Sequence, residues 1–176
     1  TRYLLGADMP ETLPNVAEFF EQSLKFSIRD KDAADFIVPT QWEGLDVMPS
    51  SPELDELHGK LESRHKIYKL RDALEKLEQD YDQIYIDTPP ALNFYTRCAL
   101  IAAEGCLIPF DCDDFSRRAL YTLMDNVEEI KADHNPRLRV EGIIVNQFQP
   151  RANLPQRMVQ ELIDEGLPVL QPYLGA

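Results

Sequence analysis

Three groups of residues in this sequence could bind a ligand, and each of them follows a short apolar run. They are Asp87 to Pro90, Asp111 to Asp114, and Asn146 to Phe148. In open α/β sheets, ligands bind beyond the carboxyl ends of the parallel strands. If the apolar runs are strands of one sheet, the three groups lie where a ligand site is expected.

The first group offers the clearest chemistry. Asp87 closes the apolar run Ile84 to Ile86 and is followed by Thr88 and two prolines. A turn must follow Asp87, because proline lacks the N–H group that a central strand donates. An aspartate at a strand end can hold Mg²⁺, directly or through water, beside the phosphates of a nucleotide, which is the Walker B role. A carboxylate that only caps the turn is the alternative.

A helix cap is the simplest interpretation of the acidic group Asp111, Asp113 and Asp114. The group precedes a predicted helix, where Asp114 or Ser116 would be the N-cap and negative charge would interact favourably with the helix dipole. A loop that faces a dimer partner or another protein is the alternative. The sequence leaves both interpretations open.

Short apolar runs alternate with longer helical patterns from residue 45 onward, which is typical of repeated βαβ units. The predicted strands span residues 45–48, 84–87, 106–110 and 140–145, and residues 25–44 are irregular apart from the apolar run 36–38. The predicted helices span residues 13–24, 52–63, 66–81, 92–103, 115–132 and 154–165. Four apolar runs lack the alternation of half-exposed strands, as strands covered on both faces do. We therefore expect an α/β fold with a doubly wound, mostly parallel sheet flanked by helices.

Length and composition favour a single domain over residues 1–176. A chain of 176 residues with 44% hydrophobic and 28% charged residues resembles an average globular protein. No apolar run approaches the roughly 18 residues of a membrane span. The opening residues Thr1 to Gly6 lack the pattern of a signal peptide, so we expect a cytoplasmic protein. Three cysteines match no metal-binding pair and are interpreted as buried thiols: Cys98, Cys106 and Cys112.

The segment Tyr81 to Leu92 is far more specific than a lone aspartate. Its sequence, YDQIYIDTPPAL, resembles the Walker B and switch region of ParA-type ATPases. Four further segments resemble the same family in the same order along the chain: residues 45–51, 99–109, 135–146 and 149–154. On these motifs the chain is identified as a member of the ParA/MinD (Soj-like) family of deviant Walker A partition ATPases.

The resemblance implies a P-loop NTPase-like fold of the ParA/MinD type that binds ATP and Mg²⁺. By this resemblance Asp87 is the magnesium residue, acting through water, and Thr88 and Pro89 line the switch that senses the γ-phosphate. Asn146 matches the position that recognises adenine, a role that suits an amide because it can donate and accept at once. An asparagine that only satisfies a turn is the alternative.

The resemblance also implies that the intact protein is an ATPase that forms a homodimer on binding ATP and is stimulated by a ParB-like partner. Its cargo would be a plasmid, a chromosome or a protein assembly. The family's KGGxGKT phosphate loop, with its catalytic lysines, has no counterpart among the 176 residues. We therefore expect an incomplete domain, which starts after the second family motif, stops before a C-terminal nucleotide-proximal loop, and is inactive alone.

Family members often bind DNA without sequence preference, and phosphate contacts by arginine would be the mechanism. Arg151 is the first candidate for such a contact, and Arg117 and Arg118 are the next. DNA binding of this kind would place the protein on the nucleoid. However, 31 acidic and 18 basic residues give a net charge of −13, which repels nucleic acid at long range. Scattered solvated charges are therefore the alternative.

Two other functions remain open at the level of the sequence. A non-catalytic binding module would have kept the ParA scaffold and lost the phosphate loop. A MinD-like membrane-positioning ATPase would end in a basic amphipathic helix beyond Ala176. The sequence upstream of Thr1 would separate the first of these from an ATPase.

Overall fold

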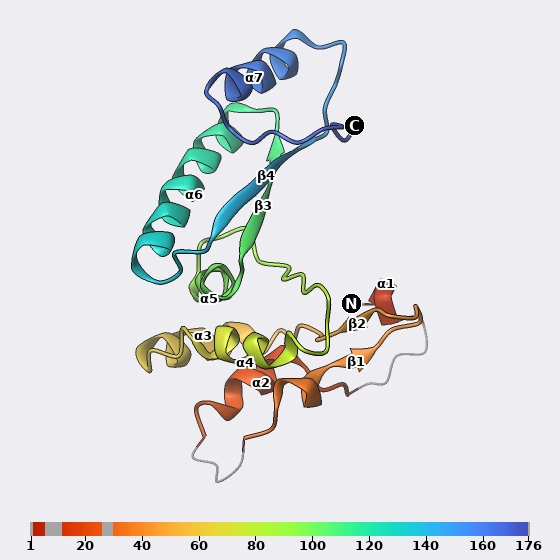
Figure 1. Cartoon of the computed structure of the whole chain (residues 1–176), viewed down its shortest axis with the longest axis vertical. Helices are drawn as coiled ribbons and strands as arrows, with labels where there is room; N and C mark the ends of the chain where they lie inside the picture. Colours follow the sequence, from red (N-terminus) through yellow and green to blue (C-terminus); the bar gives the residue numbers. More distant parts are fainter. Residues whose placement is uncertain (1, 6–11, 26–29, 176) are drawn as a thin grey trace. The chain divides into compact units, whose positions relative to one another are not determined.

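The computed structural model describes residues 2–5, 12–25 and 30–175. The chain packs as two compact units, Thr1–Ala102 and Ala103–Ala176, and each is described by itself (Figure 1). The prediction that the chain starts after the second family motif concerns residues Thr1 to Gly6, of which Thr1 and Gly6 lie outside the described residues. The single domain over residues 1–176 stays a prediction.

Helices are the main regular elements of the first unit. Its elements are α1 (Arg2–Leu5), α2 (Val16–Gln22), the 3₁₀ helix η1 (Ala33–Phe36), β1 (Val38–Pro39), β2 (Asp46–Val47), α3 (Leu54–Ser63), α4 (Lys69–Leu77) and α5 (Phe94–Ala102). Helix α2 begins where it does because the Asn15 side chain accepts hydrogen bonds from two backbone N–H groups, at 2.9 and 3.1 Å. Helix α5 has the same kind of start, since Asn93 accepts from Tyr95 N and Thr96 N at 3.0 and 3.1 Å.

The core of the first unit forms between α2, α3, α4 and α5. Phe20, Leu61 and Cys98 are among its buried residues, and the rings of Phe19 and Phe20 meet edge to face at 5.1 Å. Cys98 is fully buried, as predicted, and this burial raises the pKa of its thiol to about 12. Cys106 and Cys112 are only half-buried, although all three cysteines are free.

Strands β1 and β2 form a small antiparallel hairpin in which Val38 faces Val47. Gly44 lies in its turn with φ of 76°, a conformation that glycine adopts without the steric cost of a side chain. The strand predicted at residues 45–48 is therefore present as β2, but it pairs with β1 rather than with parallel strands.

The second unit is a βαβ arrangement with one further helix. Its elements are β3 (Gly105–Asp111), α6 (Asp114–Asp133), β4 (Arg139–Asn146) and α7 (Asn153–Asp164). The two strands are parallel and joined through α6, which lies beside them (Figure 1). The chain then returns and Val169 forms a parallel bridge with Ile143. Phe110, Ile143 and Leu162 lie in the core, each at most 1% exposed.

The α/β class with parallel strands and flanking helices is confirmed. The strand predicted at residues 84–87 is wrong, because none of the ladders or bridges among the described residues includes this segment. A strand needs a neighbour to receive its N–H and C=O groups, and an apolar run alone does not supply one. Ile84 and Tyr85 are correspondingly 40% and 81% exposed.

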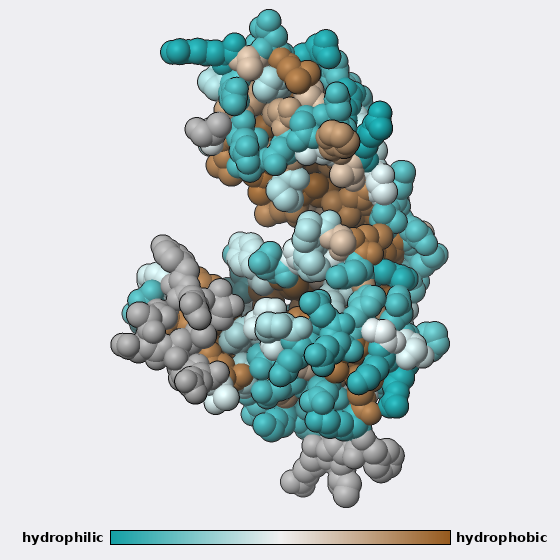
Figure 2. Space-filling view, turned by 180° about the vertical axis from the view of Figure 1, so that it is seen from behind, coloured by the Kyte–Doolittle hydropathy of each residue, from teal (hydrophilic) through white to brown (hydrophobic). Residues whose placement is uncertain are grey.

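Hydrophilic side chains cover much of the surface seen in Figure 2, with apolar side chains exposed between them. Across residues 2–5, 12–25 and 30–175, none of the helices combines the length and the apolar character that crossing a membrane requires.

Candidate functional site

Asp111 and Asn146 meet at the carboxyl ends of β3 and β4. They are directly paired in the register of the parallel ladder. The Asn146 amide nitrogen donates a hydrogen bond to Asp111 Oδ1 at 3.1 Å, and both residues are half-buried. The second and third groups singled out in the sequence are thus brought together at one edge of the sheet, where open α/β folds bind ligands.

The backbone that follows Asn146 is held in an unusual conformation. Gln147 has φ of 51°, in the left-handed region that residues other than glycine seldom adopt. The segment near the end of the chain supports this turn, because Leu174 N donates to Val145 O at 2.9 Å and Phe148 N donates to Leu174 O at 2.8 Å. No local sequence pattern predicts this support, because it comes from residues distant in the chain.

The loop after β3 is ordered by a helix cap. The Asp113 side chain accepts hydrogen bonds from Ser116 N at 2.8 Å and Ser116 Oγ at 3.0 Å. These bonds lower the pKa of the Asp113 carboxyl, the backbone N–H of Ser116 having the largest effect. The prediction of Asp114 or Ser116 as the N-cap is therefore wrong by one and three positions. The N-cap is Asp113, and Asp114 is the first residue of α6.

Asp87, Thr88 and Pro89 lie in the first unit and are all exposed. The chain after them is anchored by Thr96, a buried residue of α5 whose hydroxyl donates to Ala91 O at 2.8 Å. Sequence reasoning missed Thr96. Asn93 could have indicated the start of the helix, but no local pattern indicates the bond from the Thr96 hydroxyl to Ala91 O.

The three arginines predicted to contact DNA have different surroundings. Arg117 is half-buried and forms ion pairs from α6 to Glu161 of α7 and to Glu165, the C-cap of α7, the second at 3.3 Å. Arg118 and Arg151 are exposed. A guanidinium held by two carboxylates is less available to a phosphate, so the geometry favours Arg118 and Arg151 over Arg117 for an anion contact.

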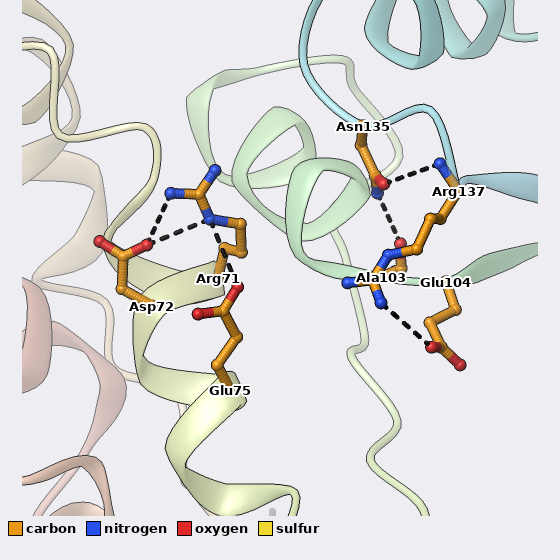
Figure 3. Close-up of polar contacts among 7 residues, drawn as sticks. All are labelled: Arg71, Asp72, Glu75, Ala103, Glu104, Asn135 and Arg137. Carbon is orange, nitrogen blue, oxygen red and sulfur yellow. Dashed lines mark hydrogen bonds and ion pairs between the residues drawn. The ribbon is translucent and has the colours of Figure 1, made fainter.

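Other polar contacts stabilise local structure within each unit (Figure 3). In α4, Arg71 contacts the carboxylates of Asp72 at 2.8 Å and Glu75 at 3.9 Å. In the second unit, the buried Asn135 donates to Ala103 O at 2.7 Å and fixes the loop before β4 to the start of β3. The Asn135 contact lies at the amino ends of β3 and β4, whereas Asp111 and Asn146 lie at their carboxyl ends. The Arg71 contacts lie within α4, and neither group of contacts indicates a ligand site.

Each of the two units holds one predicted residue whose chemistry suits a magnesium nucleotide. Asp87 is an accessible carboxylate, and Mg²⁺ commonly takes only one or two carboxylates beside the phosphates and waters. In the second unit, Asn146 supplies an amide that can both donate and accept hydrogen bonds. No cluster of three or more metal-ligating side chains occurs within the described part of the chain. The seven glycines are well separated along the sequence, so none of them forms a glycine-rich loop around phosphates.

The chain is similar in sequence to a family profile and to chromosome partitioning proteins. A family profile described as "AAA domain" matches residues 5–140. The chromosome partitioning protein ParA of Myxococcus xanthus is 35% identical over 136 residues, which are 77% of this chain and 48% of that protein. The sporulation initiation inhibitor protein Soj of Bacillus subtilis is 32% identical over 136 residues, which are 77% of this chain and 54% of that protein. The chain thus spans about half the length of these curated relatives.

A solved structure shares the fold over nearly the whole chain. It is cobyrinic acid a,c-diamide synthase from Mycobacterium smegmatis with a bound ATP analog and magnesium, with a TM-score of 0.82 and 28% sequence identity. The similarity covers 97% of this chain and 68% of that chain.

Proposed function

Since the chain belongs to the ParA/MinD family of partition ATPases, we propose that the full-length protein binds and hydrolyses Mg-ATP and uses it as a dimerisation switch. The switch would serve the partition of a plasmid or chromosome, or the positioning of another cargo. Its homodimer would form on ATP binding and release on hydrolysis, which a ParB-like partner would stimulate.

One observation carries this proposal. Asn146 lies at the carboxyl end of a parallel strand, in a fold shared with a protein whose structure holds an ATP analog and magnesium. Ligands of open α/β sheets bind at this end of the strands, so the position of the amide suits a nucleotide base. The relatives named chromosome partitioning proteins support the cellular role.

Each predicted residue has a separate task in the proposed site. The Asp87 carboxylate would hold Mg²⁺ through water, and Thr88 and Pro89 would line the switch next to the γ-phosphate. The Asn146 amide would orient the base by donating and accepting hydrogen bonds. Bound magnesium would neutralise charge on the phosphates, while the protein residues contribute position and orientation.

The first experiment measures steady-state Mg-ATP hydrolysis by the full-length gene product and by the 176-residue chain, each with and without nonspecific duplex DNA. Slow turnover that rises with DNA, and that the 176-residue chain lacks, supports the partition switch. Absence of both ATP binding and turnover in the full-length product favours a non-catalytic binding module instead.

Arg151→Glu tests the proposed DNA contact. Because Arg151 is exposed, we expect the variant to bind duplex DNA more weakly without losing its fold, and the salt slope to fall by about 1. Electrophoretic mobility or anisotropy at several salt concentrations measures both. Lys60→Glu, the same charge change on α3, is the matched control. Equal DNA affinity and slope in the two variants would move the contact away from Arg151.

A further inference from the structure

We propose that Asp111 is a positioning residue that fixes the orientation of the Asn146 amide and thereby makes the base site select adenine over guanine. This inference rests on the proposed nucleotide-binding function. It assigns a role to Asp111, for which the sequence suggested only a place in a helix cap or in a partner-facing loop.

The contact between the two side chains allows only one amide orientation. An ionised carboxylate can only accept hydrogen bonds, whereas an amide has a donating and an accepting side. The Asn146 nitrogen therefore faces Asp111 Oδ1, at 3.1 Å, because a flipped amide would bring two acceptors together. The ladder register pairs the two residues directly and keeps them in reach of each other.

The orientation leaves a defined hydrogen-bonding edge for a ligand. The second N–H of the Asn146 amide and its carbonyl oxygen remain side by side and point away from Asp111. Adenine presents an exocyclic N–H₂ donor beside a ring-nitrogen acceptor, which complements this pair. On its Watson–Crick edge, guanine has a carbonyl acceptor where adenine has the amine and a ring N–H where adenine has the ring acceptor, so a guanine bound by this edge needs the amide reversed. Reversal would break the bond to Asp111.

The other contacts at this strand end restrain the backbone rather than the amide. The bonds between Leu174 and the residues on either side of Asn146 are all made by main-chain atoms. Within the described residues, Asp111 supplies the polar side-chain contact of the Asn146 amide. Removing the carboxylate therefore frees the amide to rotate while the turn stays in place.

Asp111→Asn tests the inference in the full-length protein with almost no change in shape. An asparagine can donate as well as accept, so it satisfies either orientation of Asn146. The preference for ATP over GTP, measured as the ratio of their dissociation constants by calorimetry, should fall about tenfold. Asp114→Asn, the same chemical change in the exposed first turn of α6, should keep the wild-type ratio.

A ligand-free measurement reports the orientation itself. In a ¹⁵N–¹H spectrum, the side-chain amide signals of Asn146 should shift in Asp111→Asn, and the other asparagine amides and the backbone pattern should not. A spectrum in which Asn146 is unchanged overturns the inference without any nucleotide being present. If the signals of Asp111→Asn lose their chemical-shift dispersion, the variant is misfolded and Asp111→Glu replaces it. Asp111→Glu keeps the acceptor and should retain the preference for ATP over GTP.

The nucleotide result separates two kinds of failure. A wild-type protein that prefers ATP, with the same preference in Asp111→Asn, overturns the role of Asp111 and leaves the proposed function standing. A wild-type protein that binds ATP and GTP equally well also overturns selection by Asp111. A wild-type protein that binds neither nucleotide overturns the proposed function, and the inference with it.

Discussion

Two segments carry the residues predicted to bind nucleotide, and their backbones are held in different ways. Asn146 ends a paired strand, has Asp111 as a direct neighbour, and is followed by a turn that main-chain bonds support. Asp87 ends an apolar run of similar composition, but residues 83–89 take part in no ladder among the described residues.

The difference shows what strand pairing contributes to a site. In the second unit, register fixes which two side chains face each other, so a contact such as Asp111 to Asn146 follows from the sheet. In the first unit, the helix cap of α5 and the Thr96 hydroxyl restrain only the chain after Asp87. A motif can be specific as a string of residues and still need a neighbouring strand to become a fixed geometry.

The largest expected effect is on the free energy of unfolding, which should depend on side chains beside Asn146 far more than on those beside Asp87. Phe110→Ala empties a site in the core of the second unit that is 1% exposed, and should reduce the free energy of unfolding by about 3–5 kcal/mol. Tyr85→Ala, in the segment without a ladder, should change it by less than about 0.5 kcal/mol. Denaturant unfolding followed by circular dichroism measures the free energy of unfolding of both variants and of the wild type. Similar losses for both variants would show that residues 83–89 are packed in solution.

The second prediction concerns activity in the full-length protein. Asp87→Ala should reduce Mg-dependent ATP hydrolysis about 100-fold or more, since it removes the proposed magnesium residue. Because Asp87 is exposed, the unfolding transition should hardly move. Asp82→Ala, a neighbouring exposed carboxylate, serves as the control. Turnover equal to that of the control would remove Asp87 from the site.

The smallest effect tests the loop beside Asp111. Asp113→Ala removes the cap of α6 and should lower the melting temperature slightly at neutral pH. The folded pKa of Asp113 is below its ordinary value, so its stabilisation is present above that value and is lost as the pH falls through the folded pKa. The difference in melting temperature between wild type and variant should therefore shrink on acidification. A difference that does not depend on pH would mean that the charge of Asp113 is unimportant.

Much of the fold could be predicted because local patterns determine it. The periodicity that predicted helices at residues 115–132 and 154–165 matches α6 and α7 to within two residues. The apolar runs at residues 106–110 and 140–145 became β3 and β4, which are parallel as the βαβ pattern requires. These elements carry their own signals, since each buries one face of a helix or a strand against the next.

The rest depends on contacts between residues distant in the sequence. The sequence could place Asn146 at a strand end, but the pairing of Asp111 with it depends on register, which no local pattern states. Similarly, the two carboxylates that hold Arg117 lie in α7 and at its C-cap, so the sequence could not separate Arg117 from Arg118 as a DNA contact. The assignments of Asp87, Thr88, Pro89 and Asn146 as nucleotide-binding residues remain predictions.

The run Ile84 to Ile86, in which Ile84 and Tyr85 are exposed and which joins no ladder among the described residues, also bears on aggregation. An apolar stretch without a ladder partner is a place where separate chains can join by forming intermolecular β-structure. Asp82 and Asp87 put negative charge on both sides of the run, and the two prolines that follow cannot donate the hydrogen bonds that would extend such an assembly. Charges and prolines beside an apolar run are the features that oppose aggregation, and here they include Asp87, the proposed magnesium residue.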